Sequence, residues 1–217
     1  MEHVWRRYRV GDAEVVALQD ASVRIDSGEL VAVVGPSGSG KSTFLQLIGL
    51  LDTPSEGTVR FDGEDVGSLG DAGRTRVRLH ALGFVFQRFH LLNQLSAVEN
   101  VMLPLEAAGV GVVERYARAS SLLDSVGLGD RLLFRPAQLS GGQRQRVAIA
   151  RAVANGPGVV LADEPTGELH TDDKERVLEL FLALNAQGRT VVIVTHDPDV
   201  AAVARRRIEI RDGRLRA

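Results

Sequence analysis

The chain has 217 residues, of which 44% are hydrophobic and 25% charged, with a formal net charge of −2. These values are ordinary for a globular protein with one sizeable core, and the charge gives no reason to expect direct nucleic-acid binding. The chain has no cysteine, which excludes disulfides and thiolate metal sites, and no apolar run nears the roughly 20 residues that a membrane helix needs. The polar, basic segment 1–10 does not resemble a signal peptide.

The N-terminal region predicts a small antiparallel sheet. Segments 15–18, 21–25 and 58–61 are short, partly alternating in hydrophobicity and separated by turns. Tyr8 precedes the first strand pair.

Three other apolar runs predict the core of a parallel sheet. Segments 30–34, 159–162 and 191–194 are rich in Val and Ile and near-continuous, which is typical of strands buried on both faces. A strand-like run also covers 84–86. Ligands of such sheets bind at the carboxyl ends of the strands. The sequence therefore predicts an α/β fold, with its site where these strands end.

Helical periodicity dominates from about residue 96 to residue 155. It predicts helices over 114–126 and 141–154, besides a helix over 43–51 that follows the first buried strand. We interpret 88–155 as a helical subdomain inserted into a core of 1–87 and 156–217, within a single domain of 1–217. The cluster Arg205–Arg207 is interpreted as a solvated helix end.

The segment Gly35-Pro36-Ser37-Gly38-Ser39-Gly40-Lys41-Ser42 fits the phosphate-loop pattern G-x-x-x-x-G-K-[ST] between a strand and a helix. A capped glycine turn would also contain such residues, but the strand and helix on either side favour the phosphate loop. Lys41 is expected to reach the β- and γ-phosphates and the Ser42 hydroxyl to ligate Mg²⁺. The residues predicted to surround the phosphates are Gly35, Ser37, Gly38, Ser39, Gly40, Lys41, Ser42 and Thr43.

The strand at 159–162 is followed by Asp163 and Glu164. Beside a phosphate loop, Asp163 is expected to hold Mg²⁺ and Glu164 to poise a water for attack on the γ-phosphate. Without that loop, the same two residues would fit an ordinary polar turn equally well. Adjacent residues of a strand point in opposite directions, so separate roles are expected unless the strand ends by Glu164. Pro165 favours such a break.

The segment Leu139-Ser140-Gly141-Gly142-Gln143 predicts a bare helix N-terminus that binds an anion. Ser140 and Gln143 also fit a helix capping box, which leaves the two glycines unexplained, because each weakens a first helical turn by about 0.5–1 kcal/mol. Phosphate approach explains the glycines, and the two interpretations are compatible. The anion is expected to belong to a nucleotide held by a second copy of the chain.

Two further residues follow predicted strands. The Gln87 amide is placed to reach the metal or the attacking water, and His196 to donate to a γ-phosphate oxygen. Taken alone, each is more often an ordinary surface or turn residue. The neighbouring motifs favour catalytic roles for both residues.

Taken in order, these motifs closely resemble the ATP-binding cassette of ABC transporters over nearly the whole chain. The resemblance identifies Gln87 as the Q-loop, 139–143 as the signature, Asp163 and Glu164 as the Walker B pair and His196 as the switch histidine. It also implies that Tyr8 is the aromatic residue that stacks on the adenine. It implies an ATPase that uses ATP and Mg²⁺ and dimerises head to tail, with each ATP between one chain's phosphate loop and the other's signature helix. It also implies an integral-membrane permease partner, and a cytoplasmic chain held at the inner face of the cell membrane through it.

Segments 83–87, 97–101 and 163–167 resemble the subgroup of lipoprotein-release and macrolide-export ATPases. The chain departs from the family at Glu168-Leu169-His170, where relatives carry an Asp in place of His170. The alternative function is a soluble ABC-type ATPase in nucleic-acid metabolism or cell-division signalling. Long coiled-coil insertions, typical of the nucleic-acid class, are not seen in the sequence.

Overall fold

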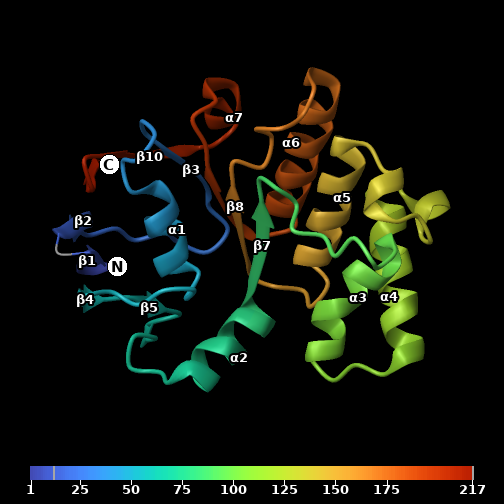
Figure 1. Cartoon of the computed structure of the whole chain (residues 1–217), viewed down its shortest axis with the longest axis horizontal. Coiled ribbons are helices and arrows are strands. Elements are labelled where there is room, and N and C mark those ends of the chain that lie inside the picture. Colours follow the sequence, from blue (N-terminus) through green and yellow to red (C-terminus); the bar gives the residue numbers. More distant parts are fainter. Residues whose placement is uncertain (12, 217) are drawn as a thin grey trace.

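A computed structural model describes residues 1–11 and 13–216 of the chain. Its centre is a six-stranded sheet of order β11-β10-β3-β9-β8-β7 (Figure 1). The strands pair in parallel, except for β11, which pairs antiparallel with β10. Their bounds are β3 Leu30–Val34, β7 Leu82–Phe86, β8 Val159–Asp163, β9 Thr190–Val194, β10 Arg206–Arg211 and β11 Arg214–Arg216. The predicted buried strands are confirmed, as is the α/β class.

A second, antiparallel sheet of order β2-β1-β4 lies beside the first, with a small β5-β6 hairpin. Its strands are β1 Glu2–Val10, β2 Ala13–Ala21 and β4 Glu56–Thr58, and the hairpin is β5 Arg60–Phe61 and β6 Glu64–Asp65. The strand expected over 21–25 is wrong, because β2 ends at Ala21 and pairs with β1 instead. The sequence hid β1 because four of its nine residues are Arg or Glu, so that it lacks an apolar period.

Helices α1, α5 and α6 pack against the sheet, whereas α3 and α4 form a separate layer beside α5 (Figure 1). The bounds of the helices are α1 Lys41–Ile48, α2 Asp71–Ala81, α3 Ala97–Ala107, α4 Val112–Ser125, α5 Gly141–Ala152, α6 Thr171–Ala186 and α7 Pro198–Ala202, with short 3-10 turns at Gly129–Arg131 and Pro136–Gln138. In the described residues, no helix is both long and apolar enough to cross a membrane.

Alternate residues of the parallel strands bury two different cores. Leu161 and Val192 pack with α1 and the antiparallel sheet, whereas Val160 and Ile193 pack with α5 and α6. A third cluster joins α3, α4 and α5. Helix α5 therefore contributes to both the sheet core and the helical layer.

The expected helix end at Arg205–Arg207 is wrong, because α7 ends at Ala202 and β10 begins at Arg206. Within β10, the buried Ile208 and Ile210 alternate with exposed residues. This period of two is typical of a strand with one wet face. The arginine run hid the period because Arg206 and Arg207 are consecutive.

Asn100 fastens the segment between β7 and α3. Its side chain is fully buried; Oδ1 accepts from the Leu92 amide at 2.8 Å, and Nδ2 donates to the Ser96 carbonyl at 2.9 Å and to the Leu92 and Leu95 carbonyls at 3.2 Å. Replacing it would leave buried backbone groups without partners.

We expect Asn100→Ala to lower the free energy of unfolding by about 2–4 kcal/mol, since several buried hydrogen bonds are lost together. Urea unfolding measures the change, and an unaltered m-value would show that the same surface unfolds. Asn93→Ala is the control, because Asn93 lies in the same segment but is exposed. Equal losses in both variants would contradict this role of Asn100.

Candidate nucleotide site

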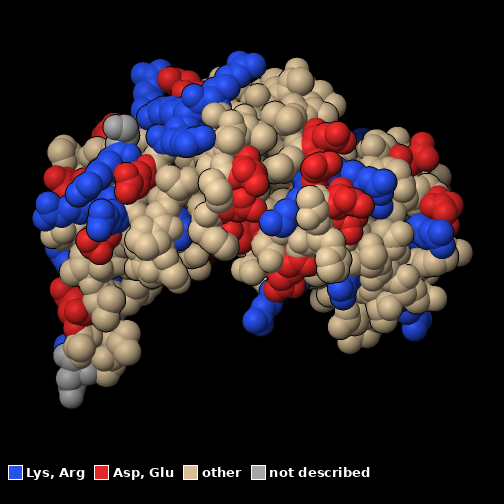
Figure 2. Space-filling view, turned by 90° about the horizontal axis from the view of Figure 1, so that it is seen from above, with Lys and Arg blue, Asp and Glu red and all other residues tan. Residues whose placement is uncertain are grey.

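Parallel pairing brings the segments that follow four strands to one edge of the sheet. Asp163 is in register with Phe86 on one side and Val194 on the other, and Val194 is in register with Val33. The residues after each strand therefore share this edge, which Figure 2 views from above with acidic side chains gathered along its middle.

The phosphate loop runs from Gly35 into α1 and has a fixed shape. Gly40 has φ 108°, and a Cβ on it would overlap the carbonyl oxygen of Ala17 in β2, so only glycine fits there. The largely buried Lys41 donates from Nζ to the carbonyl oxygens of Gly35 and Pro36, each at 2.9 Å. The ammonium thus lies against the two residues that open the loop, where it adds positive charge to the cradle.

The Walker B carboxylates separate because β8 ends at Asp163. Glu164 has φ 45°, in the left-handed region, and its amide donates to the Val194 carbonyl at 2.9 Å. Burial, and then the charge of Glu164, raise the pKa of Asp163, whereas a hydrogen bond from Ser42 and the charge of Lys41 oppose this shift. The carboxyl of Asp163 therefore sits in a site that favours added positive charge.

Glu164 contacts the turn after β9. Its Oε1 lies 2.7 Å from His196 Nδ1, and its Oε2 accepts from Thr195 Oγ1 at 3.3 Å. A carboxylate only accepts, so Nδ1 carries the proton in this contact, and a neutral His196 has a bare Nε2. The histidine can donate from Nε2 only as an imidazolium or after it leaves Glu164.

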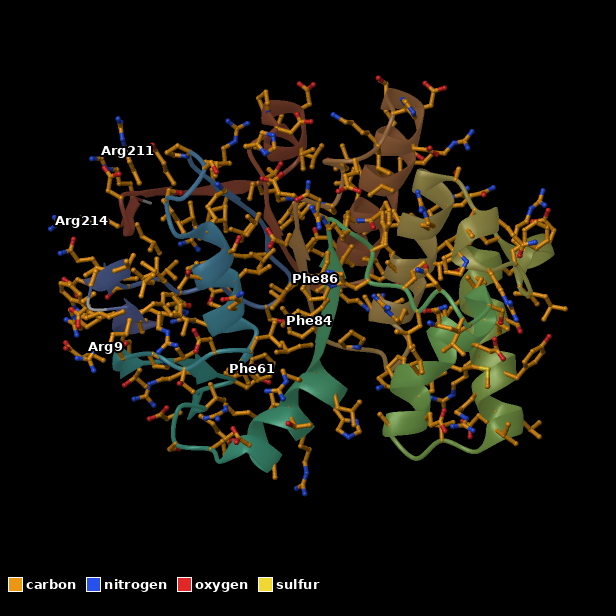
Figure 3. The ribbon with its side chains drawn as sticks, viewed as in Figure 1. Arg9, Phe61, Phe84, Phe86, Arg211 and Arg214 are labelled. Carbon is orange, nitrogen blue, oxygen red and sulfur yellow. The ribbon has the colours of Figure 1, made fainter. Side chains whose placement is uncertain are left out.

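Gln87 lies beside the segment that follows Glu164. A Cβ on Gly167 would lie 3.1 Å from Gln87 Nε2, so the amide lies against this turn while the residue remains exposed. Phe86, the residue before it, ends β7 and is labelled in Figure 3 at the upper end of that strand. Gln87, Glu164 and His196 therefore lie around one edge.

Tyr8 lies in β1, away from the parallel strands. Its hydroxyl donates to Asp52 Oδ2 at 2.8 Å, and the Arg6 guanidinium lies 4.5 Å from its ring centroid. Arg6 also pairs with Asp52 at 2.8 Å. These contacts hold the ring in place and set the Arg6 guanidinium over one of its faces.

The signature segment forms the N-terminus of α5, which lies across β7 and β8 from α1 in Figure 1. The capping box is present: Ser140 Oγ accepts from the Gln143 amide at 3.2 Å, and the Ser140 amide donates to Gln143 Oε1 at 2.9 Å. The signature and the phosphate loop of one chain thus lie on opposite sides of these strands.

The structure changes the argument from the two glycines. A Cβ on Gly142 would overlap the Asp173 carboxylate, so a larger residue here requires the Asp173 side chain to move. Packing therefore gives Gly142 a reason within the chain, and phosphate approach to this helix end stays a prediction. A Cβ on Gly141 would meet Leu169 at an ordinary 3.6 Å, so Gly141 alone lacks a packing reason.

Sequence reasoning missed three residues of α5 that hold the site. Fully buried Gln145 donates from Nε2 to the Pro165 carbonyl at 2.7 Å, directly after Glu164. Arg144 and Arg151 contact the segment after Gln87. Their spacing of seven, which places both on one helix face, was the only signal available.

Comparison with known proteins gives one family. The family model described as "ABC transporter" matches residues 18–167, which is more than half of the chain. A "Macrolide export ATP-binding/permease protein MacB 1" of Yersinia pestis bv. Antiqua (strain Antiqua) is 52% identical over 217 residues, covering 100% of this chain and 33% of that protein. The chain thus spans about a third of the length of the first curated relatives it matches.

Shorter relatives and solved structures agree in fold. An "Uncharacterized ABC transporter ATP-binding protein YknY" of Bacillus subtilis (strain 168) is 48% identical, covering 99% of this chain and 94% of that protein. The "Dimeric structure of a post-hydrolysis state of the ATP-binding cassette MJ0796 bound to ADP and Pi" matches with a TM-score of 0.93 and 43% identity, covering 100% of this chain and 95% of that one.

We expect Asp163→Asn to raise the free energy of unfolding of the nucleotide-free chain at pH 7–8. A raised native pKa means that ionised Asp163 costs stability, increasingly as the pH rises from its ordinary 3.8 through the native value. The gain should be constant above that native pKa and should shrink as the pH falls through it toward 3.8. Thermal unfolding from pH 8 downward measures it, and a gain that grows toward acid would contradict the shift.

We expect Gly142→Ala to lower the free energy of unfolding by about 1–3 kcal/mol through overlap with Asp173. Asp173→Ala in the same chain should restore most of that loss, because it removes the overlapping carboxylate. Gly141→Ala is the matched control and should stay within about 1 kcal/mol, the ordinary helix-propensity range. No recovery in the double variant would show that the overlap is not the cause.

Proposed function

Because the chain belongs to the ABC transporter family, we propose that it binds and hydrolyses ATP as the nucleotide-binding part of a transporter. The observation that carries the proposal is the placement of Glu164 against His196 at the edge where the phosphate loop begins. This pairs a water-activating carboxylate with a phosphate cradle, which is the arrangement that phosphoryl transfer to water needs.

In the proposed reaction, Lys41 turns from the loop carbonyls toward the β- and γ-phosphates, and the loop backbone binds their oxygens. Glu164 orients and accepts a proton from the attacking water. Its carboxylate is free for this role only when the contact with His196 opens or shifts. That release also frees Nδ1–H of His196 to reach a γ-phosphate oxygen, so one movement prepares both side chains.

The residues of the site fit Mg²⁺. In residues 1–11 and 13–216 there is no cluster of three or more His, Cys, Asp or Glu that could hold a metal alone. Mg²⁺ bound with a nucleotide takes one or two protein ligands plus phosphates and waters, so such a cluster is not required. Ser42, Asp163 and Gln87 would hold it. When bound, Mg²⁺ neutralises charge that develops on the transferred phosphoryl group.

We propose further that two copies dimerise head to tail around two ATP molecules. One chain places Ser140–Gln143 across β7 and β8 from its own phosphate loop (Figure 1), so each ATP would need the signature of the other copy. The α5 N-terminus, where a Cβ on Gly141 would make only ordinary contacts, is the surface offered to the γ-phosphate. The dimeric solved cassette with ADP and Pi supports this arrangement.

The proposed partner is an integral-membrane permease of the macrolide-export or lipoprotein-release type, since the longer relatives named above join an ATP-binding part to a permease part. The chain would then lie in the cytoplasm, against the inner face of the membrane. We propose no nucleic-acid partner. The proposed organisation remains one domain of 1–217, with 88–155 as the helical subdomain; the separate buried cluster of α3, α4 and α5 supports it.

We expect Glu164→Gln to keep ATP binding while lowering kcat by about 10²–10⁴-fold, because the general base is lost and the fold is kept. Phosphate release measures kcat, and size-exclusion chromatography with ATP and Mg²⁺ should show a trapped dimer. Lys41→Ala is the comparison and should lose tight ATP binding as well. Turnover by Glu164→Gln at the parent rate would overturn the role of Glu164.

A further inference from the structure

Two strained residues follow Gln87. Phe89 and His90 have φ 59° and 48°, consecutive non-glycine residues in the left-handed region. The left-handed conformation of each residue costs roughly 1–2 kcal/mol of free energy. The surrounding structure must therefore impose it.

This strained pair closes the turn that carries Gln87. The Phe89 amide donates to the Phe86 carbonyl at 3.2 Å, which makes Gln87 and Arg88 the central residues of a turn. The rings of Phe86 and His90 lie 4.7 Å apart. The direction of the Gln87 side chain therefore depends on the backbone at Phe89 and His90.

Helix α5 imposes that backbone. Arg151 donates from one guanidinium nitrogen to the His90 carbonyl at 2.5 Å and from another to the Phe89 carbonyl at 2.8 Å. About two helical turns earlier in α5, the Arg144 guanidinium lies 5.0 Å from the centroid of the buried Phe89 ring. A planar guanidinium can hold two adjacent carbonyls at once, which an ammonium does less well.

Burying the Arg151 guanidinium costs free energy, which other interactions must offset. Burial lowers the pKa of Arg151, and no carboxylate of the described residues forms an ion pair with it. A guanidinium stays charged in a protein, so the two carbonyls are its main compensation. The half-buried guanidinium and the carbonyls of the two strained residues therefore stabilise one another.

We propose that Arg151 is a positioning residue for ATP hydrolysis: by fixing Phe89 and His90 in the left-handed region, it makes the signature helix set the position of Gln87. This rests on the proposed ATPase function. Gln145 of the same helix donates to the carbonyl of Pro165, the residue after Glu164. Helix α5 therefore contacts both the segment that follows Gln87 and the segment that follows Glu164.

The test compares Arg151→Met with Arg146→Met. Arg146 lies on the same helix, is also desolvated and also donates to a loop carbonyl, that of Val126 at 2.8 Å, but this loop is remote from Gln87 in the sequence. We expect Arg151→Met to lower kcat by about tenfold to a hundredfold, with KM for ATP within about twofold, since a small displacement of one catalytic group has this effect. Arg146→Met should leave kcat within about twofold of the parent.

Two further variants separate positioning from general loosening. In a Gln87→Ala background, Arg151→Met should change kcat by less than about twofold, because the residue it positions is gone. His90→Gly should recover part of the kcat lost in Arg151→Met, because glycine adopts the left-handed region without strain. Multiplying losses in the double variant, or no recovery by His90→Gly, would overturn the proposal.

Amide hydrogen exchange tests whether Arg151 holds the backbone of Phe89 and His90, and it needs no measurement of ATPase activity. Exchange at Phe89 and His90 should quicken in Arg151→Met and stay unchanged in Arg146→Met. If the parent chain hydrolyses no ATP, the proposed function fails while this exchange result still stands. Unchanged exchange in Arg151→Met would overturn the inference even in an active ATPase.

Discussion

The hydrogen-bond ladder that joins β3, β9, β8 and β7 in parallel is the constraint on which the site depends. It aligns the carboxyl ends of four strands that come from distant parts of the sequence. The phosphate loop, Gln87, the Walker B pair and His196 meet because each follows one of these ends. The ladder places the segments, but it does not orient the side chains.

Orientation comes from residues outside the sheet. Glu164 turns into the left-handed region just past β8 and meets His196, and Gln145 fixes the next peptide from α5. Phe89 and His90 are held in a similar way. Strain at these places is a sign that the functional geometry is imposed by packing and is not the local preference of the chain.

The sequence predicted the elements whose patterns are local. Continuous apolar strands and the phosphate loop are marked by composition and spacing, and the fold class followed from them. Strand β1 was missed because its charged residues show no period, and Arg206 was assigned to a helix end because charge masked the alternation of β10. The roles of Arg151 and Gln145 depend on which loops their helix meets in space, and no spacing in one sequence records that.

The close approach of Gly142 to Asp173 affects how variants of such chains should be interpreted. A damaging substitution at position 142 would ordinarily be attributed to lost nucleotide contact, although crowding against Asp173 within one subunit acts on the same position. Positions 142 and 173 should accordingly change together among homologues, with a bulkier residue at one accompanied by a smaller residue at the other. Position 141, free of such crowding, is the more direct reporter of the proposed contact between this helix end and a second subunit.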